Sequence, residues 1–415
     1  MKKYGCIGKK LAHSFSKEIH SKLADYQYEL IELDESEIES FFCEKNFNAI
    51  NVTIPYKQTV IPYLDSLSDV AKRIGAVNTI INKNGRLYGF NTDYYGMKAL
   101  IEKIGIEPKN KKVLILGTGG TSKTARVLTE DMGASEVITV SRNKSENYIT
   151  YEEAIKHHSD AEVIINTTPS GMYPDCDSQP IDIDEFKNLE GVVDAVYNPL
   201  CTNLVLKAKE KGIKAEGGLY MLVMQAVVAV EKFLDNNIPK TVEKNVFASV
   251  LASKENIVLT GMPGSGKSTV GKLLDIDGFV FVDTDEEIEK RCGCKIKELI
   301  NLKGEKYFRD IETEVIKDIS SKGCRIISTG GGAVLREENV RYLKRNGKLF
   351  FLNADFGRLL PTDSRPLSDT ADKLKKLYDE RIDIYKSTAD VVVPDMATPE
   401  DEAQFILNIR TDLIK

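Results

Sequence analysis

Two glycine-rich loops constrain the fold of this 415-residue chain more than any other feature. The first, VLILGTGGTSKTA, spans residues 113–125, and the second, LTGMPGSGKST, spans residues 259–269. Each loop follows an apolar run with strand character and precedes a run with helical character. A glycine-rich turn between a strand and a helix presents backbone N–H groups and the positive end of the helix to phosphate groups. The chain is therefore expected to contain two α/β phosphate-binding folds in series.

Short apolar segments alternate with helical segments around both loops. KKVLILG, SEVITVS, AEVIINTT and GVVDAVYN predict strands in the first half, and NIVLTG, FVFVDTD, RIISTGG and KLFFLNA predict strands in the second. This alternation is typical of parallel sheets with crossover helices. Because a chain of this length exceeds one ordinary core, we expect at least two domains, with a junction at residues 240–255.

The first half is itself expected to contain two lobes. NAINVTIPYK predicts a strand running into a turn, and GAVNTIINKNGRLYGFNTD predicts two strands around Asn84-Gly85. YMLVMQAVVAV, at residues 220–230, predicts a buried helix. We therefore expect a substrate lobe over the first 98 residues and a dinucleotide lobe after it. Crevices between such lobes are common binding sites.

Composition narrows the range of partners. A net charge of −6 argues against nucleic acid as the main partner, because phosphate backbones select basic surfaces. No run approaches the ~20 apolar residues of a membrane span, and Lys2 and Lys3 are not followed by an apolar signal sequence. The seven cysteines are scattered, and Cys292 and Cys294 lack a second pair for zinc. These features predict a cytoplasmic protein that binds neither membranes nor nucleic acid and acts on small molecules, with its oligomeric state open.

The first loop favours a dinucleotide. Gly117 permits the tight turn, and Gly119 and Gly120 allow the backbone to approach a pyrophosphate. Ser141, Arg142, Asn143 and Lys144 follow the next predicted strand, where NAD-binding folds usually place an acidic residue. A guanidinium there favours the 2′-phosphate of NADP. A plain strand-to-helix turn and an exposed basic turn remain as alternatives, and the sequence does not decide firmly between NADP and NAD.

Seven motifs in the first half occur in a familiar order. HSFSKEIH, NVTIPYK, GAVNT, GFNTD, GTGGTSKTA, NTTPSGM and GGLYMLVMQA together resemble shikimate dehydrogenase over roughly residues 1–245. The resemblance implies NADPH-dependent reduction of the ring ketone of 3-dehydroshikimate. It also implies a substrate lobe over residues 1–98, completed by a helix near 220–240, and a Rossmann-type NADP-binding lobe over residues 99–219. One departure is that Tyr94 and Tyr95 stand before Gly96, where the family often continues NTDG.

The resemblance assigns roles to individual residues. Lys57 and Asp93 match a catalytic pair that can move a proton and anchor a ring hydroxyl. Ser14 and Ser16 match the residues that bind the substrate carboxylate. Tyr197 is expected to flank the site or to pack in the core, and His13 and His20 are interpreted as packing or capping residues. The remaining expected substrate contacts are Asn51, Thr53, Asn78 and Gln225.

The second loop matches the pattern G-x-x-x-x-G-K-[ST], which binds nucleoside triphosphates. Lys267 is expected to reach the β- and γ-phosphates, and Ser268 to ligate Mg²⁺. The loop by itself does not identify the acceptor. The predicted nucleotide contacts of this loop are Gly261, Gly264, Gly266, Lys267, Ser268 and Thr269.

Motifs after this loop identify an acceptor by resemblance. VDTD, GEKYFRD, STGGGAV, DSRPL and ERIDIYKSTAD occur in an order similar to shikimate kinase over residues 254–415. The resemblance implies a nucleoside monophosphate kinase-like α/β domain that phosphorylates shikimate with ATP. Asp283 would organise Mg²⁺, Asp285 would act as base on the acceptor hydroxyl, and Arg365 would come from a lid that looks short. The implied shikimate contacts are Asp285, Arg309, Gly330, Gly331, Gly332 and Arg381.

Together the two resemblances predict one chain that makes a hydroxyl from a ketone and then phosphorylates it. A sensing scaffold that binds shikimate and nucleotides without turnover is an alternative, although Lys57, Asp93 and Lys267 argue against it. A dehydrogenase that also accepts quinate, and a kinase for another small acceptor, are further alternatives.

Overall fold

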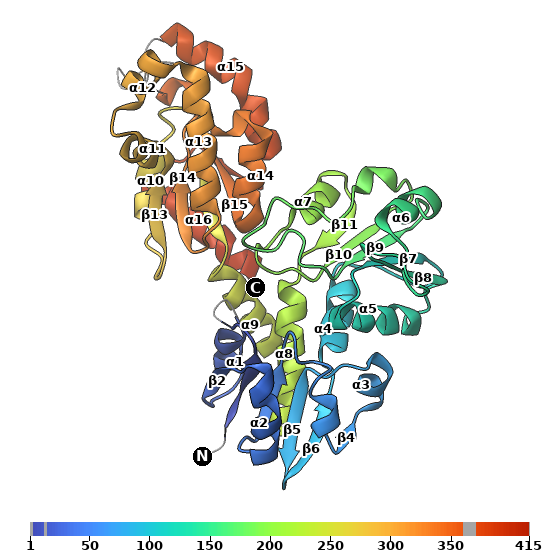
Figure 1. Cartoon of the computed structure of the whole chain (residues 1–415). Helices are drawn as coiled ribbons and strands as arrows, with labels where there is room; N and C mark the ends of the chain where they lie inside the picture. The colour runs from blue at the N-terminus through green and yellow to red at the C-terminus, as the bar shows by residue number, and fades with distance from the viewer. Residues whose placement is uncertain (1–2, 12–14, 360–370, 415) are drawn as a thin grey trace. The chain divides into compact units, whose positions relative to one another are not determined.

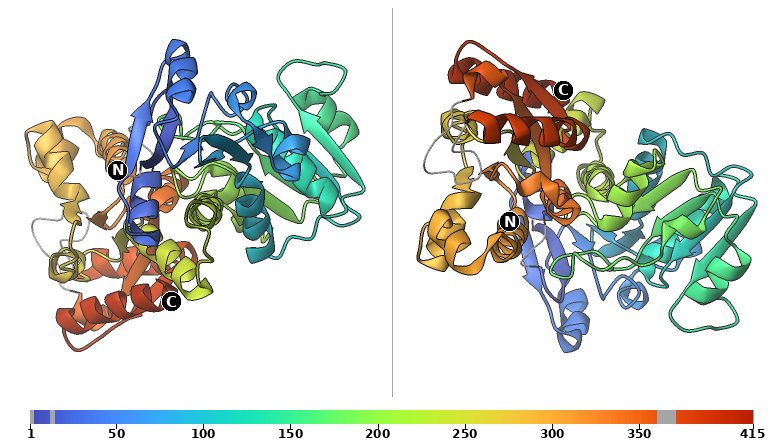
Figure 2. Two further views of the ribbon diagram at one scale, coloured as in Figure 1. Left: turned by 90° about the horizontal axis from the view of Figure 1, so that it is seen from below. Right: turned by 90° about the horizontal axis from the view of Figure 1, so that it is seen from above.

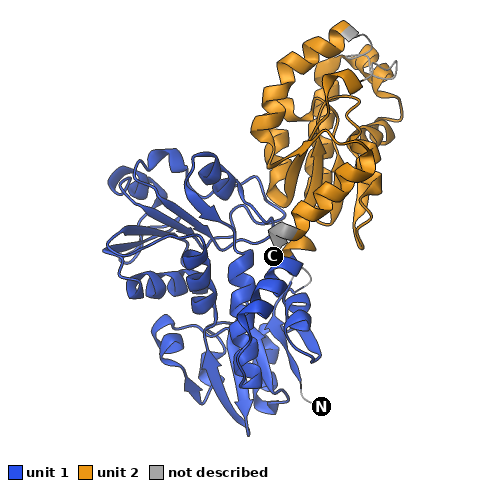
Figure 3. Cartoon of the chain, turned by 180° about the vertical axis from the view of Figure 1, so that it is seen from behind, with its two compact units in different colours: residues 1–250 blue, residues 251–415 orange. Residues whose placement is uncertain are grey.

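The structure is a computed structural model that describes residues 3–11, 15–359 and 371–414 of the chain. It divides into two compact units, residues 1–250 and residues 251–415 (Figure 3). The first unit holds two sheets and the second holds one (Figure 1). Ser14 and Arg365 lie outside the described residues.

The first lobe of unit 1 is built on a mixed six-stranded sheet with the order β2-β1-β3-β5-β6-β4. Strands β1, β2 and β3 are parallel, whereas β5 pairs antiparallel with both β3 and β6. The expected hairpin around Asn84-Gly85 is confirmed. The elements are β1 (Tyr4–Gly8), α1 (Ser16–Leu23), β2 (Tyr28–Glu32), α2 (Ile38–Glu44), β3 (Ala49–Val52), β4 (Ser66–Leu67), α3 (Asp69–Ile74), β5 (Thr79–Lys83) and β6 (Arg86–Phe90).

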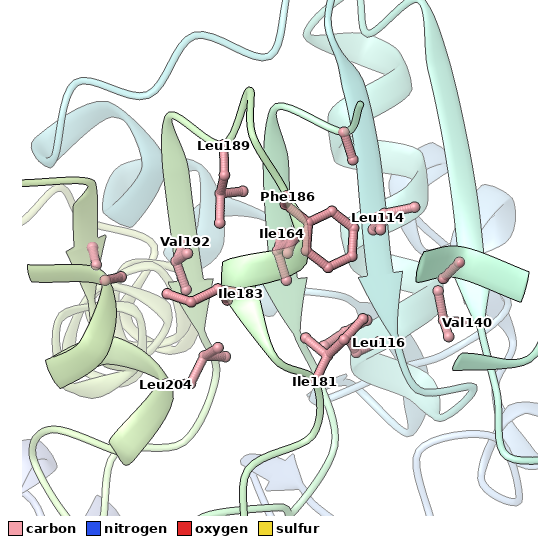
Figure 4. Packing of buried hydrophobic residues seen from close by; sticks show 14 of the residues in the cluster. Leu114, Leu116, Val140, Ile164, Ile181, Ile183, Phe186, Leu189, Val192 and Leu204 are labelled. Atoms are coloured by element: carbon pink, nitrogen blue, oxygen red, sulfur yellow. The ribbon is translucent and has the colours of Figure 1, made fainter. Parts of the chain in front are cut away.

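The second lobe of unit 1 is a parallel five-stranded sheet with the order β11-β10-β9-β7-β8. Its apolar strands are covered by helices and by a loop that places the Phe186 ring between Ile164 and Leu114 (Figure 4). The parallel crossover pattern expected from the strand motifs is confirmed. Helix α4 (Asp93–Lys103) leads from the first lobe into this one, and the further elements are β7 (Lys112–Leu116), α5 (Gly120–Asp131), β8 (Glu136–Val140), α6 (Tyr151–His157), β9 (Val163–Asn166), β10 (Gly191–Asp194), α7 (Asn203–Glu210) and β11 (Lys214–Glu216).

Helix α8 (Leu219–Leu234) returns from the second lobe to the first and packs along α4. It is seen along its axis in Figure 2. Ala229 and Phe233 cover the apolar face of the first sheet. Gly96 brings the backbones of α4 and α8 together, because a Cβ there would lie 2.5 Å from the Met221 carbonyl oxygen. The buried helix expected from YMLVMQAVVAV is thus confirmed.

Unit 2 is a parallel five-stranded sheet with the order β13-β14-β12-β15-β16, and helix α9 (Lys240–Ala252) precedes it. The phosphate-binding loop joins the central strand β12 to the short helix α10. The elements are β12 (Asn256–Thr260), α10 (Lys267–Leu273), β13 (Val280–Asp283), α11 (Thr284–Cys292), α12 (Ile296–Lys303), α13 (Glu305–Ser320), β14 (Arg325–Ser328), α14 (Glu337–Asn346), β15 (Gly347–Asn353), α15 (Ala371–Thr388), β16 (Val391–Pro394) and α16 (Pro399–Ile414).

The residues that the structure describes contain neither a membrane-spanning helix nor a cluster of metal ligands. None of their helices is long and apolar enough to cross a membrane. Across the same residues, no group of three or more His, Cys, Asp or Glu side chains is arranged to hold a metal ion, and Cys292 and Cys294 are free.

Candidate active sites

A cavity of about 690 Å³ in unit 1 is lined by both of its lobes and by α8. Nearly every substrate contact expected from the sequence lies on its wall, although Ser14 is not among the described residues. The cavity also exposes Thr121, Thr167 and Thr168, for which the sequence supplied no role. The expected residues on the wall are Ser16, Asn51, Thr53, Lys57, Asn78, Asp93, Tyr197 and Gln225.

Lys57 and Asp93 form an ion pair in this cavity. The Lys57 Nζ lies 2.6 Å from the Asp93 Oδ2, and their side chains are only 16% and 10% exposed. Asp93 is the first residue of α4, so the positive end of the helix dipole favours its negative charge. The pair is therefore held at one point of the wall, with a proton donor next to a carboxylate.

Hydrogen bonds fix the amide side chains around this pair. The Thr92 N–H donates to the Asn78 Oδ1 at 2.6 Å, and the Asn78 Nδ2 donates to the Thr92 Oγ1 at 3.0 Å. The Tyr28 hydroxyl donates to the Asn51 Oδ1 at 2.7 Å. The Gln225 Nε2 donates to the Leu222 carbonyl oxygen at 2.9 Å. These contacts orient the wall before any ligand binds.

His20 and Tyr197 both make contacts with aromatic rings. His20 is fully buried and stacks on the Tyr28 ring, with centroids 3.9 Å apart. Burial lowers the pKa of His20 to about 3, so the ring is neutral and agrees with a packing role. Tyr197 lines the cavity and also packs edge-on against the Phe15 ring.

The first glycine loop lies next to the ion pair. Gly117 has φ +107°, a conformation that favours glycine at the turn after β7. Gly119 and Gly120 begin α5, and a Cβ on Gly120 would lie 3.7 Å from the Lys57 Cδ. A pyrophosphate bound at this helix terminus would therefore lie beside the wall that holds Lys57.

The basic turn after β8 lies outside this cavity. Arg142 and Asn143 are exposed, and the Asn143 N–H donates to the Ser141 Oγ at 3.3 Å. Lys144 forms an ion pair with Glu153 of α6, so its charge is partly neutralised. Arg142 lies near enough to Tyr151 to oppose the rise in the pKa of that phenol, which burial causes. Of the two cations in this turn, Arg142 is thus the better placed to meet a 2′-phosphate.

A cavity of about 420 Å³ lies in unit 2, between the second glycine loop, α13 and α15. Gly261 is not on its wall; instead its carbonyl oxygen accepts from the Lys267 Nζ at 2.9 Å. Arg365 lies outside the described residues. The expected residues on the wall are Gly264, Gly266, Lys267, Ser268, Thr269, Asp283, Asp285, Arg309, Gly330, Gly331, Gly332 and Arg381.

Hydroxyl and carboxylate oxygens meet at one end of this cavity. The Ser268 Oγ donates to the Asp283 Oδ2 at 2.6 Å, and the Asp285 N–H donates to the Asp283 Oδ1 at 2.9 Å. Oxygen donors of this kind suit Mg²⁺, which needs few protein ligands when a nucleotide supplies the rest. Ser268 and Asp283 therefore fit the metal role expected for them.

Two arginines approach a run of glycines at the other end. The Arg381 Nη1 donates to the Gly331 carbonyl oxygen at 3.2 Å. A Cβ on Gly330 would lie 2.7 Å from the Asp285 Oδ1, so a side chain there would occupy the space beside that carboxylate. Likewise, a Cβ on Gly332 would clash with the Nη1 of the Arg309 guanidinium, so the lack of a side chain lets that group lie against the backbone.

Glu312 is a member of this site that the sequence did not reveal. It is fully buried, and its Oε2 accepts from the Arg309 Nη1 at 2.8 Å. Burial raises the pKa of Glu312, and the nearby Arg309 opposes the rise. The sequence does contain one indication of this contact: Glu312 lies three residues after Arg309, and residues at this spacing share one face of a helix.

Two family models match the chain. The model of the shikimate dehydrogenase substrate binding domain matches residues 6–80, and the shikimate kinase model matches residues 263–410. A shikimate dehydrogenase (NADP(+)) of Clostridium perfringens strain SM101 is 38% identical over 266 residues, which covers 60% of this chain and 97% of that relative.

Solved structures resemble the same part of the chain. Shikimate dehydrogenase 1 from Peptoclostridium difficile matches with a TM-score of 0.56 and 34% identity, over 60% of this chain and 98% of that one. Shikimate 5-dehydrogenase from Thermus thermophilus, in complex with NADP(H) and shikimate, matches with a TM-score of 0.53 and 27% identity, over 60% and 99% of the two chains.

Proposed function

Because the chain belongs to the shikimate dehydrogenase family and carries a shikimate kinase domain behind it, we propose that it catalyses two consecutive reactions on one small acid. Unit 1 reduces 3-dehydroshikimate to shikimate with NADPH. Unit 2 transfers the γ-phosphoryl group of ATP to shikimate and forms shikimate 3-phosphate. The scattered cysteines and the use of NADPH and ATP are consistent with a reducing cytoplasm.

The Lys57–Asp93 ion pair is the observation that carries the first activity. Bound NADPH supplies the hydride, and the reduced ketone oxygen then needs one proton. Lys57 donates this proton from its ammonium group, while Asp93 keeps the lysine in place and accepts a hydrogen bond from a ring hydroxyl. Asn51, Asn78 and Gln225 line the wall around that ring.

The arrangement of Ser268, Asp283 and Asp285 supports the second activity. Ser268 and Asp283 would hold Mg²⁺ together with ATP, and the ion would supply positive charge to the transferring phosphoryl group. Asp285 accepts the proton of the attacking hydroxyl, and Lys267 binds the phosphates. Arg309 and Arg381 bind the shikimate carboxylate, since guanidinium groups pair well with planar carboxylates.

One pair of variants tests both assignments on the purified chain. Lys57→Ala should abolish NADPH oxidation with 3-dehydroshikimate and leave phosphorylation of supplied shikimate intact. Lys267→Ala should do the reverse. NADPH absorbance and mass spectrometry of shikimate 3-phosphate report the two steps. Failure of the unaltered chain in either assay would remove the corresponding activity from the proposal.

A further inference from the structure

Tyr94 follows the Asp93 carboxylate directly, yet its side chain does not line the cavity. Its hydroxyl instead donates to the Asp131 Oδ2 at 2.8 Å. Arg73 grips the same carboxylate with two hydrogen bonds, at 3.0 Å to Oδ2 and 2.6 Å to Oδ1. We call these three residues the Asp131 clasp.

The clasp joins the two lobes of unit 1. Arg73 lies on α3 of the first lobe, and Tyr94 lies at the start of α4, which leaves that lobe. Asp131 is the last residue of α5 in the second lobe. The contact is therefore a connection between the part that carries Lys57 and the part that carries the glycine loop.

The clasp rests on an apolar base, which distinguishes it from an isolated surface ion pair. Ile74, Ala76 and Val127 are buried together, and Val70 and Tyr94 pack against them. Exposed ion pairs contribute little alone because water and side-chain entropy oppose them. Here the ring of Tyr94 is already ordered by packing, so its hydroxyl donates at a smaller entropic cost.

Helix α5 transmits this connection to the cofactor loop. Its twelve residues span about 18 Å, and it contacts the first lobe at both ends. At the N-terminal end, Gly120 approaches Lys57, and the Lys123 Nζ donates to the Gln58 Oε1 at 3.2 Å. At the other end is the clasp. Because a helix is stiff, holding its C-terminal end sets the position of its N-terminal end.

We propose that Tyr94 is a positioning residue for hydride transfer. With Arg73 and Asp131 it sets the distance between the dinucleotide held by α5 and the Lys57–Asp93 pair. This proposal rests on the reductase activity proposed above. It also accounts for a tyrosine at the position where the resembling motif NTDG has glycine.

Tyr94→Phe is the sharpest test, because it removes one hydroxyl and keeps the packed ring. We expect kcat for reduction to fall by about five- to tenfold, since small misplacements of reacting groups are costly. The kinetic isotope effect with deuterated NADPH should rise, because the hydride step becomes more rate-limiting. Dissociation constants for shikimate alone and NADP⁺ alone should stay within about twofold.

Tyr95→Phe is the matched control. Tyr95 is exposed, and its ring lies 5.3 Å from that of Tyr94, but its hydroxyl makes no contact with Asp131. This variant should match the unaltered chain. Tyr94→Phe made in an Asp131→Asn background should lower kcat for reduction little further, because the group that accepts the hydrogen bond from the Tyr94 hydroxyl is already weakened.

A readout without activity separates this proposal from the reductase assignment. Amide hydrogen exchange at the C-terminal turn of α5 should be faster in Tyr94→Phe and unchanged in Tyr95→Phe. If the unaltered chain does not reduce 3-dehydroshikimate, the assigned function fails and the positioning role fails with it, while exchange still decides whether the clasp exists. Unchanged kcat, isotope effect and exchange in Tyr94→Phe would overturn the proposal.

Discussion

Replacing Gly96 with alanine should lower the reductase activity and leave the kinase activity unchanged, because the added methyl group disturbs the packing of α4 against α8. A Cβ at this position lies 2.5 Å from the Met221 carbonyl oxygen and 2.9 Å from the Gln225 Cβ. Tight contacts relax at about 3.4 Å, so α4 and α8 must move apart by about 0.9 Å. Overpacking of this kind costs about 1–3 kcal/mol. In a domain the size of unit 1, that lowers Tm by roughly 2–12 °C.

The same shift should also lower kcat for reduction, because α4 begins with Asp93 and α8 carries Gln225, and both residues line the cavity. A misplacement near 1 Å costs about 100-fold in rate, so kcat for reduction should fall to about 1%. Phosphorylation should keep its full rate. Lys98→Ala is the control, since Lys98 is exposed on the same helix. A Gly96→Ala chain with normal reductase kcat and Tm would refute the reasoning, and equal loss of both activities would show that the units are not independent.

Two further outcomes concern buried carboxylates. Burial raises the pKa of Asp194 to about 7 from its usual 3.8, against donors from Thr202, Asn166 and the Val196 N–H. The native state then holds the extra proton, so the contribution of Asp194 to unfolding free energy falls as pH rises from about 4 to about 7. In the Asp194→Asn variant, the free energy of unfolding of unit 1, measured with urea, should no longer show this decline with pH. A pH dependence equal to that of the unaltered chain would contradict this expectation. The Glu312→Gln variant should hold Arg309 less firmly. The KM for shikimate should therefore rise about tenfold, while the KM for ATP stays constant. Equal changes in both KM values would contradict the role of Glu312 in orienting Arg309.

The strands and the two glycine loops could be predicted because they depend on local patterns, whereas the expected cavity residues came from the two family resemblances. Apolar runs end at Leu116 and Thr260, and the loops that follow must lie at the carboxyl edges of their sheets. Lys57 and Asp93 were found by resemblance, and the fold brings them within 2.6 Å. Their separation in sequence, by contrast, contains no information about that distance.

Features that depend on tertiary packing could not be predicted. The contact between Tyr94 and Asp131 joins residues 37 positions apart. Asp194 appears as an ordinary strand-end acid until burial changes its pKa. Glu312 was three residues from a recognised arginine, but only the fold shows that it is fully buried. The burial of these side chains depends on which helices cover the sheet, and local periodicity does not encode that choice.

The return of α8 to the first sheet has a consequence for biosynthesis. Tyr4, Tyr28 and Ile81 lie under Ala229 and Phe233, so one face of the sheet stays uncovered until α8 has been made. About 140 residues separate β6 from the end of α8, and a ribosome needs roughly 7–30 s to add them. During that interval the apolar side chains on this face of the sheet are exposed to water, where they are prone to aggregation. A fragment that ends at residue 98 would lack Ala229 and Phe233 and would leave this apolar face of the sheet exposed to water.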